Sequence, residues 1–325
     1  MKRNRFVTFI VALLTLAWLP FVPAQAKEYP DRPIRLIVAS TAGSAPDVLA
    51  RILSRELEAS LKQPVIVDNR PGAGGVVGTD ALAKSAADGY TLGLGHDGTM
   101  AINTVLYKSL PYSPTRDFAA VAPLALNEFV LIAHPSTGIK SFSEFVDFVK
   151  SHKGAATYAS AGSGTPNHVF MEQLLQKIDA KMVHVPYRGG AAAVADVAGG
   201  QAQFMLAGIA PALSQIKAGR VTPLAVIQPK RSGILPDVPT VGETLQGFSL
   251  ETWFGLFAPA RTPQTVVDLL NREVLQILSR PSVAEKLMQQ GMSIKTGPAS
   301  ALTELVQQDI KRYSELATKI KLEAN

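Results

Sequence analysis

Short apolar runs alternate with amphipathic segments along most of this chain. The stretch 34–38 is continuously apolar, as expected of a strand buried on both faces of a sheet. Apolar residues then recur at helical spacing from 48 to 61, which predicts an amphipathic helix. The same alternation predicts further strands at 64–67, 91–95, 129–134, 156–160, 182–185, 202–206, 221–227 and 251–259, and helices at 75–87, 141–151, 165–179, 190–198, 211–218 and 299–322. Strands and helices joined by short connections indicate an α/β fold with mostly parallel sheets.

The alternation runs in two successive series, which predicts two lobes, each a mostly parallel sheet flanked by helices. The C-terminal helices follow the second series without a sheet of their own, so we expect them to pack on the first lobe. The chain would then cross between the lobes twice, and two crossings form a hinge beside a cleft. We therefore expect lobe one at 27–127 plus 254–325 and lobe two at 128–253.

The first 26 residues have the pattern of a secretory signal peptide. Lys2, Arg3 and Arg5 precede the apolar run FVTFIVALLTLAWL, and the small-residue pattern AQA follows at 24–26. We expect export with cleavage before Lys27. The alternative is an uncleaved membrane anchor, for which the apolar run is short.

Composition excludes several kinds of chemistry. The chain has no Cys, so disulfides and thiolate catalysis are ruled out. Its net charge of +6 falls to +3 without the predicted signal peptide, and no basic cluster with interleaved aromatics indicates nucleic acid. No GxSxG, GxxxxGK[ST] or HExxH motif is present, and His168 and Glu172, spaced i,i+4, have no third ligand. We expect neither an enzyme nor a bound metal or cofactor.

Two turns of similar sequence enter helices in the two series. TAGSAPD (41–47) and SAGSGTPN (160–167) each follow an apolar run and precede a helix. Ser44 and Thr165 are plausible N-caps, and both turns present backbone N–H groups at the positive end of a helix. Such groups bind anions, and in open α/β sheets ligands bind at the carboxyl ends of the strands. The repetition predicts a two-sided clamp for a carboxylate. The alternative is the ordinary chemistry of βα turns.

Three further features bear on this site. RPGAGGVVG (70–78) lacks the spacing of a dinucleotide fingerprint and is better interpreted as a third loop rich in N–H groups. His96 and Asp97 end the third strand at the same edge, where they either contact a ligand or stabilise the loop by hydrogen bonds. Asp47 is expected to cap its helix and to pair with Arg51.

Four segments in fixed order give the chain a resemblance to a known family across nearly all of its length. They are YPDRPIRLIV (29–38), DNRPGAGGVVGTDALAKSAADGYTL (68–92), HVPYRGGAAAVADVAGGQ (184–201) and TWFGLFAPARTP (252–263). Together they resemble the Bug family, the periplasmic solute-binding proteins of tripartite tricarboxylate transporters.

The resemblance implies a type II periplasmic-binding fold in the periplasm of a Gram-negative bacterium. It also implies a monomer, a large and a small membrane subunit as partners, and a ligand carboxylate held by backbone groups and ordered waters between the turns at 40–44 and 161–165. The expected ligand contacts are Ser40, Thr41, Ala42, Gly43, Ser44, Asp47, His96, Asp97, Ala161, Gly162, Ser163, Gly164, Thr165, Tyr187, Arg188 and Gly208.

The chain departs from the family pattern at two places. Members often carry PFxPGG in the first turn, where this chain has ASTAGS at 39–44, and FMLAGIAP (204–211) lacks the acidic residue of many relatives. Both departures favour a mono- or dicarboxylate without an amino group, aromatic acids included. Two other functions stay open at this point: a ligand sensor that serves a sensor kinase, and a periplasmic enzyme acting on a small carboxylate.

Overall fold

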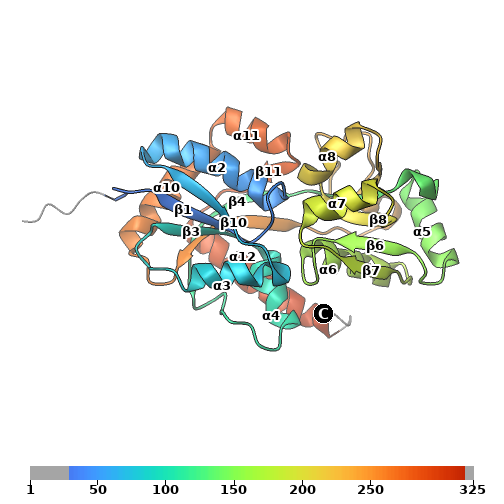
Figure 1. Ribbon diagram of the computed structural model, residues 1–325, viewed down its shortest axis with the longest axis horizontal. Coiled ribbons are helices and arrows are strands. Elements are labelled where there is room, and N and C mark those ends of the chain that lie inside the picture. The colour runs from blue at the N-terminus through green and yellow to red at the C-terminus, as the bar shows by residue number, and fades with distance from the viewer. Residues whose placement is uncertain (1–28, 319–325) are drawn as a thin grey trace, which may run out of the picture. The chain divides into compact units, whose positions relative to one another are not determined.

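The computed structural model describes residues 29–318, and within this range the chain from Arg32 onward forms one compact unit (Figure 1). The predicted signal peptide, 1–26, lies outside the described residues. Within the described range no helix is both long enough and apolar enough to cross a membrane.

The first sheet has six strands in the order β11-β4-β10-β3-β1-β2. Their bounds are Ile34–Val38 (β1), Val65–Asn69 (β2), Thr91–His96 (β3), Phe118–Asn127 (β4), Thr252–Pro259 (β10) and Met292–Ile294 (β11). β1 pairs in parallel with β2 and β3, whereas β10 runs antiparallel to β3 and β4, and β11 antiparallel to β4.

The second sheet has five strands in the order β7-β6-β8-β5-β9. Their bounds are Phe129–Ala133 (β5), Thr157–Ser160 (β6), Val183–Pro186 (β7), Phe204–Gly208 (β8) and Thr222–Val226 (β9). β6 is parallel to β7 and β8, but β5 is antiparallel to β8 and β9. Both sheets are therefore mixed rather than mostly parallel. The antiparallel pairs arise where the chain passes between the sheets, because β4 leads out of the first sheet and β10 leads back into it.

Helices cover both faces of the first sheet. Figure 1 shows α2, α10 and α11 on one face and α3 and α12 on the other. The bounds are Ala45–Leu61 (α2), Ala73–Gly75 (η1), Val76–Ala83 (α3), Gly98–Ile102 (η2), Asn103–Leu106 (α4), Gln264–Leu278 (α10), Pro281–Met288 (α11) and Ala299–Ala317 (α12). The C-terminal helices α10 and α12 both contact β4. The lobe boundaries predicted from the sequence remain a proposal, which this contact supports.

The second sheet also packs helices on its two faces. The bounds are Pro135–Thr137 (η3), Phe142–Ser151 (α5), Pro166–Lys177 (α6), Gly190–Ala198 (α7), Ile209–Lys217 (α8) and Val241–Thr244 (α9). The central strand β5 is buried along its whole length. Phe129 and Leu131 join an apolar cluster with α5 and α6, whereas Val130 and Ile132 join another with α7 and α8. Burial on both faces explains the continuous apolar run in the sequence.

One long strand, β4, was not predicted from the sequence. Its residues, FAAVAPLALN, are rich in alanine and include Pro123, which argues against a central strand. The strand tolerates Pro123 because it lies opposite Gly255, where the register with β10 shifts.

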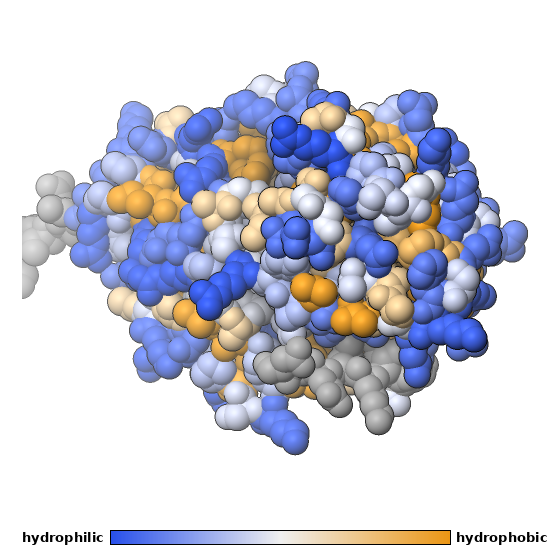
Figure 2. Space-filling model, turned by 45° about the vertical axis from the view of Figure 1, so that its right-hand side comes forward, coloured by the Kyte–Doolittle hydropathy of each residue, from blue (hydrophilic) through white to orange (hydrophobic). Residues whose placement is uncertain are grey.

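The face shown in Figure 2 carries mostly polar residues, with apolar residues in small separate patches. The exposed large apolar side chains include Ile66, Val77, Val183 and Met288, which belong to four different elements. Scattered apolar residues of this kind do not mark an interaction surface.

Candidate functional site

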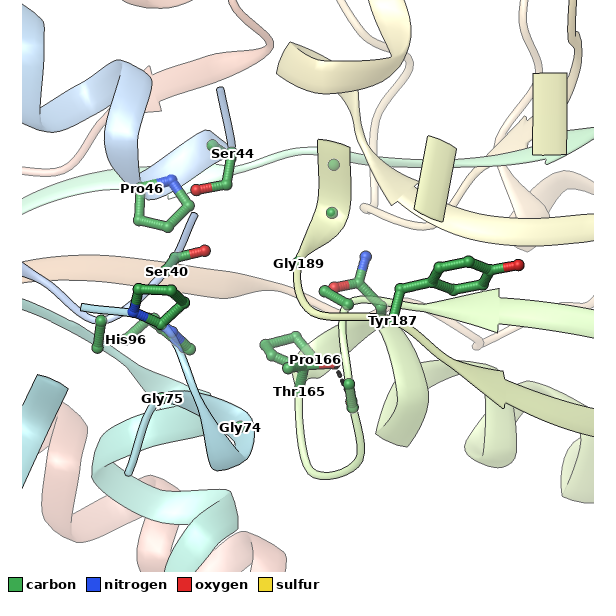
Figure 3. A pocket seen from close by; sticks show the side chains of 18 of the residues that line it. Ser40, Ser44, Pro46, Gly74, Gly75, His96, Thr165, Pro166, Tyr187 and Gly189 are labelled. Carbon is green, nitrogen blue, oxygen red and sulfur yellow. Dashed lines mark hydrogen bonds between the residues drawn. The ribbon is translucent and has the colours of Figure 1, made fainter. Parts of the chain in front are cut away.

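A cavity of about 350 Å³ lies between the two sheets, lined by residues from both (Figure 3). Its walls follow the carboxyl ends of β1, β2, β3, β6, β7 and β8. This is the edge where open α/β sheets bind ligands. In Figure 3, Ser40, Ser44 and His96 face Thr165 and Gly189 across the opening.

The two similar turns adopt the same local structure. Ser44 donates both its backbone N–H and its hydroxyl to the carbonyl oxygen of Thr41, at 3.3 and 2.6 Å. Thr165 does the same to the carbonyl oxygen of Gly162, at 3.2 and 2.6 Å. Each hydroxyl is thus turned back into its own loop, and neither caps the helix that follows. The repeated sequence therefore forms the same uncapped helix start in both halves of the molecule.

Five helices of the described structure begin at the cavity without a side-chain cap: α2, α3, α6, α7 and α8. The first backbone N–H groups of an α-helix have no partner inside the helix, and together they form its positive end. In the described part of the chain, the N–H groups of Ala45 and Asp47 in α2 and of Asn167 in α6 have no hydrogen-bond acceptor. Ala45 and Asn167 line the cavity, so their N–H groups are available to an anion there.

Several of the N–H groups expected to form the clamp are already used by the protein itself. Gly43 N–H donates to Asp47 Oδ2 at 2.9 Å, Gly162 N–H to Ser160 Oγ at 3.1 Å, and Gly164 N–H to His168 Nδ1 at 3.2 Å. Ser163 N–H, another of the predicted donors, has no acceptor in the described structure, and Ser163 lines the cavity. The three hydrogen bonds hold the turns in shape, and further open donors lie two to five residues beyond them, at the helix starts.

Asp47 does not line the cavity. Its buried carboxylate accepts hydrogen bonds from Gly43 N–H, from Arg51 Nε at 2.9 Å and from Asn69 Nδ2 at 2.9 Å. Burial alone would raise the pKa of Asp47. The hydrogen bonds from Arg51, Gly43 and Asn69 lower this pKa by more than burial raises it, so the pKa of Asp47 lies below its usual value. Asp47 is thus ionised. It stabilises the first turn from a position outside the cavity lining and pairs with Arg51, as predicted.

Asp97 is also displaced from its expected role. Its side chain is completely buried, accepts a hydrogen bond from Thr252 Oγ1 and accepts another from Tyr313 Oη at 3.0 Å. It therefore ties β3 to β10 and α12 and stabilises the loop, which was the alternative expectation.

His96 does line the cavity. Its Nδ1 accepts the backbone N–H of Gly98 at 3.0 Å, so the neutral ring carries its proton on Nε2. The ring can therefore donate a hydrogen bond to a ligand.

A pair of stacked histidines supports the second turn. The ring centroids of His168 and His184 lie 4.1 Å apart, and His184 Nε2 is 2.6 Å from Ser160 Oγ. Burial lowers the pKa of His168 to about 3, with a further lowering by His184, and burial lowers the pKa of His184 to about 4. Both rings are neutral at neutral pH. Within residues 29–318, no group of three His, Asp or Glu side chains could hold a metal ion.

Ten of the predicted contacts line the cavity: Ser40, Ser44, His96, Ala161, Gly162, Ser163, Thr165, Tyr187, Arg188 and Gly208. Figure 3 shows the Tyr187 hydroxyl pointing away from Ser40 and His96. Six are not among the lining residues: Thr41, Ala42, Gly43, Asp47, Asp97 and Gly164. The carboxylates of Asp47 and Asp97 and the N–H groups of Gly43 and Gly164 form hydrogen bonds within the protein instead.

The structure also adds lining residues that were not among the predicted ligand contacts. They include the loop 71–75, Tyr107, Asn127, Phe129, Asn167, Gly189 and Thr252. The glycine-rich sequence of 70–78 could have identified the loop 71–75 as part of the lining. Asn127 and Thr252 lie where the chain passes between the sheets, so their positions depend on the tertiary fold.

The lining is electrostatically one-sided. Among the described residues that line the cavity there is no Asp, Glu or Lys, whereas Arg188 and His96 are present. Together with the helix starts, this favours an anion and gives a ligand ammonium group no carboxylate partner.

The two halves contact each other on both sides of the cavity, at glycines. A Cβ placed on Gly74 would lie 2.7 Å from the carbonyl oxygen of Ser163, and one on Gly189 would lie 2.1 Å from Thr41 Oγ1. Both glycines have positive φ, of 61° and 140°. A side chain at either position would keep the two loops apart.

Comparison with known proteins agrees with this geometry. A family model described as the tripartite tricarboxylate transporter family receptor matches residues 49–322. The chain is 35% identical to a UPF0065 protein of Pseudomonas sp. (strain P51) over 299 residues, covering 91% of this chain and 89% of the relative. It is 33% identical to protein BugT of Bordetella pertussis (strain Tohama I) over 316 residues, covering 97% of each chain.

Three solved structures have the same fold. The periplasmic binding protein BugD superposes with a TM-score of 0.87 at 31% identity, covering 91% of this chain and 99% of BugD. Rpa4515 of R. palustris, solved with adipate, has a TM-score of 0.87 at 28% identity and coverage of 90% and 98%. MatC of Rhodopseudomonas palustris, solved with bound malate, has a TM-score of 0.83 at 32% identity and coverage of 88% and 99%. The predicted periplasmic-binding fold is thereby confirmed.

Proposed function

Because the chain belongs to the tripartite tricarboxylate transporter receptor family, we propose that it captures a small organic carboxylate in the periplasm and delivers it to a membrane transporter of the tripartite tricarboxylate type. The resemblance inferred from the four sequence segments is thus confirmed at the level of the family. The ligand and the transporter are the proposed parts.

One observation carries the proposal: uncapped helix starts meet at a cavity that has no acidic lining residue in the described structure. A carboxylate bound there would accept N–H groups that are oriented in advance. Charge-assisted hydrogen bonds of this kind are worth about 1.5–3 kcal/mol each. Donors at α2 and α6 come from opposite halves, so a bound anion would stabilise the closed arrangement by its differential affinity for it.

The rest of the cavity narrows the ligand class to mono- or dicarboxylates without an ammonium group. Phe129, Phe254 and Tyr107 provide apolar wall, and a cavity of about 350 Å³ suits a small organic acid, aromatic acids included. Structures of the related proteins contain adipate and malate, two dicarboxylates without an amino group.

We propose that the bound acid leaves the site unchanged. His96, the ionisable side chain best placed to act as a base, has its Nδ1 engaged by Gly98, and Ser40 and Ser44 have no histidine as a hydrogen-bond partner in the described structure. The described residues of the site thus provide groups that bind the acid but no activated nucleophile. Recovery of each bound acid unchanged after long incubation, measured by mass spectrometry, tests this.

The binding test is a thermal-shift screen of organic acids followed by calorimetry. A ligand that binds only the folded protein raises the melting temperature. We expect succinate, malate, adipate or an aromatic acid to bind, and aspartate to bind at least about tenfold more weakly than malate because its ammonium group would lack a partner. Tight binding of aspartate, or of an uncharged sugar in place of every acid, would contradict the proposed ligand class.

The delivery step needs a test in cells. Deletion of the gene should abolish uptake of the radiolabelled acid, and uptake should return with the full chain and with the large and small membrane subunits present. Uptake that persists in the deletion strain while transcription of transport genes no longer responds to the acid would favour a sensor-kinase role.

A further inference from the structure

Asn127 places an amide side chain in the wall of the cavity. It is the last residue of β4, and its backbone pairs with Thr252 of β10 on one side and with Met292 of β11 on the other. The residue is 7% exposed and is one of those that line the cavity. Strands on both sides therefore hold the backbone from which this amide projects.

The two polar atoms of the Asn127 amide differ in their surroundings. Oδ1 is enclosed by protein atoms, so a ligand cannot reach it. Nδ2 also has no hydrogen-bond partner in the described structure, but it is not enclosed in this way. The amide therefore presents a donor, and not an acceptor, at the surface of the cavity.

A second amide accounts for this orientation. Gln228 is a neighbour within the protein, and its Oε1 accepts the backbone N–H of Phe129 at 3.2 Å. Its Nε2 is a buried donor without a partner among the described residues. A buried donor favours an acceptor beside it, so Oδ1 of Asn127 belongs on the protein side and Nδ2 on the cavity side.

Nδ2 of Asn127 lies beside the start of α2. A Cβ placed on Gly208 would be 3.4 Å from Asn127 Nδ2 and 3.6 Å from the Cβ of Ala45. Ala45 is the first residue of α2, lines the cavity and has an open backbone N–H. A carboxylate has two oxygens that each accept hydrogen bonds at about 2.7–3.2 Å, so one such group can bind both donors.

The protein offers Nδ2 no acceptor of its own. Thr252, opposite Asn127 in the ladder, forms its side-chain hydrogen bond with Asp97, and no Asp or Glu is among the described lining residues. The other polar group at this point, the N–H of Ala45, is itself a donor. Two donors without an acceptor are suited to a ligand group that only accepts hydrogen bonds, which is the property of an ionised carboxylate.

We propose that Asn127 is a specificity-determining residue whose Nδ2 donates a hydrogen bond to the ligand carboxylate at the start of α2. This rests on the proposed carboxylate binding and deepens it, because it assigns one of the donors to a side chain. The pair of donors also excludes the corresponding carboxamide. The NH₂ group of a carboxamide would face Asn127 Nδ2 or the Ala45 N–H, donor against donor.

The test compares acids with their fully amidated counterparts in calorimetry: succinate and succinamide, adipate and adipamide, phenylacetate and phenylacetamide. For the acid that binds the wild type best, we expect a preference over its amide of at least about a hundredfold. Asn127→Ala should weaken binding of that acid at least about tenfold, because one charge-assisted hydrogen bond is lost.

Asn127→Asp distinguishes a direct contact from a structural role. It keeps the shape of the side chain but replaces the donor by a negatively charged acceptor. The new carboxylate would repel the acid and could accept an N–H of the amide. We therefore expect binding of the acid to weaken more than in Asn127→Ala, binding of the amide to weaken in neither variant, and the preference for the acid to fall at least about a hundredfold in Asn127→Asp.

Asn271→Asp is the matched control. Asn271 lies on α10, outside the cavity lining, and its Nδ2 donates to the carbonyl oxygen of Val121 at 2.7 Å. The same change there removes an amide donor and adds a charge away from the ligand. We expect the affinity for the acid and the preference over the amide to stay within about threefold of the wild type. Melting temperatures without ligand show whether each variant is folded.

The outcomes separate the two proposals. If Asn127→Ala binds the acid as tightly as the wild type, the role of Asn127 is wrong while carboxylate binding stands, and this holds whether or not Asn127→Asp folds. Equal weakening by Asn127→Ala and Asn127→Asp with an unchanged preference would also overturn the direct contact. If none of the three acids nor any other carboxylate in the screen binds the wild type, the proposed function itself fails, and the role of Asn127 fails with it.

Discussion

Thr41 and Gly189 contact each other beside the cavity, although one follows β1 in the first sheet and the other follows β7 in the second. The contact is so close that a Cβ on Gly189 would lie 2.1 Å from Thr41 Oγ1. Within the described residues, that hydroxyl oxygen is buried without a hydrogen-bond partner. The absence of a side chain at residue 189 is therefore a condition for this approach of the two halves.

Gly189→Ala should hinder the closed arrangement. We expect ligand affinity to fall at least about tenfold, roughly 1.4 kcal/mol, because the added methyl meets Thr41. Calorimetry measures the loss, and small-angle scattering shows whether ligand still makes the protein more compact.

The double variant Thr41→Ala/Gly189→Ala separates the collision from backbone strain, since φ of 140° at residue 189 disfavours alanine in any surroundings. Partial recovery of affinity in the double variant is expected. If it binds no better than Gly189→Ala alone, strain and not the contact with Thr41 explains the loss.

Thr165→Ala removes the hydroxyl that bonds the carbonyl oxygen of Gly162 at 2.6 Å. The second turn then loses one internal hydrogen bond, worth about 1 kcal/mol, so we expect a lower melting temperature and a several-fold weaker affinity. Thr165→Ser keeps the hydroxyl and should behave like the wild type. Calorimetry and thermal unfolding compare the three proteins, and equal weakening by Ser and Ala would contradict a role for this bond.

Arg188→Gln should slow the capture of anionic ligands. Arg188 is exposed at the rim of the cavity, so its charge acts mainly by attraction over a distance. Stopped-flow association rates should fall a few-fold at low salt and converge with the wild type at high salt, where screening is strong. Arg220→Gln, at an exposed position outside the lining, is the control and should change neither rate.

The histidine pair predicts a loss of stability in acid. His168 has a folded pKa of about 3 against an ordinary value of 6.5, so unfolding takes up a proton between these values. Its contribution is fully present above pH 6.5 and is lost as the pH falls, by about 2 kcal/mol at pH 5. His184, lowered to about 4, acts in the same direction.

Thermal unfolding from pH 7.5 to 4.5 measures this dependence. His184→Gln removes one of the two titrating rings and can still hydrogen-bond Ser160, so its melting temperature should fall less steeply with decreasing pH. A slope identical to that of the wild type would show that the pair does not cause the acid sensitivity.

The predicted signal peptide has a direct test by intact mass. Protein expressed from the full sequence and recovered from the periplasm should have the mass of a chain that begins at Lys27. A recovered protein that keeps residues 1–26 would favour the membrane-anchor alternative.

The sequence predicted the alternation of strands and helices well where burial decides it. β5 is buried on both faces and appears as a continuous apolar run, and Pro166 marks the start of α6. β4 could not be found in this way, because its alanines and Pro123 do not have the composition of a strand, and its neighbours β10 and β11 lie far along the chain.

The same limit applies to the site. The repeated turns pointed to the correct edge of both sheets, but which N–H groups stay open depends on side chains that fold back, such as Asp47 onto Gly43 and His168 beside Gly164. Asn127 and Thr252 come together with the helix starts only through the tertiary fold. No local pattern in the sequence marks either residue.

The open donors at Ala45 and Asn167, two residues that line the cavity, belong to the main chain and not to side chains. A side-chain substitution cannot delete a backbone N–H unless it introduces proline. In evolution, then, the main-chain groups proposed to hold the carboxylate would be insulated from most point mutations, while neighbours such as Ser40 and Tyr107 could vary freely. A scaffold of this kind can acquire new ligands by single substitutions without first losing its hold on the acid group.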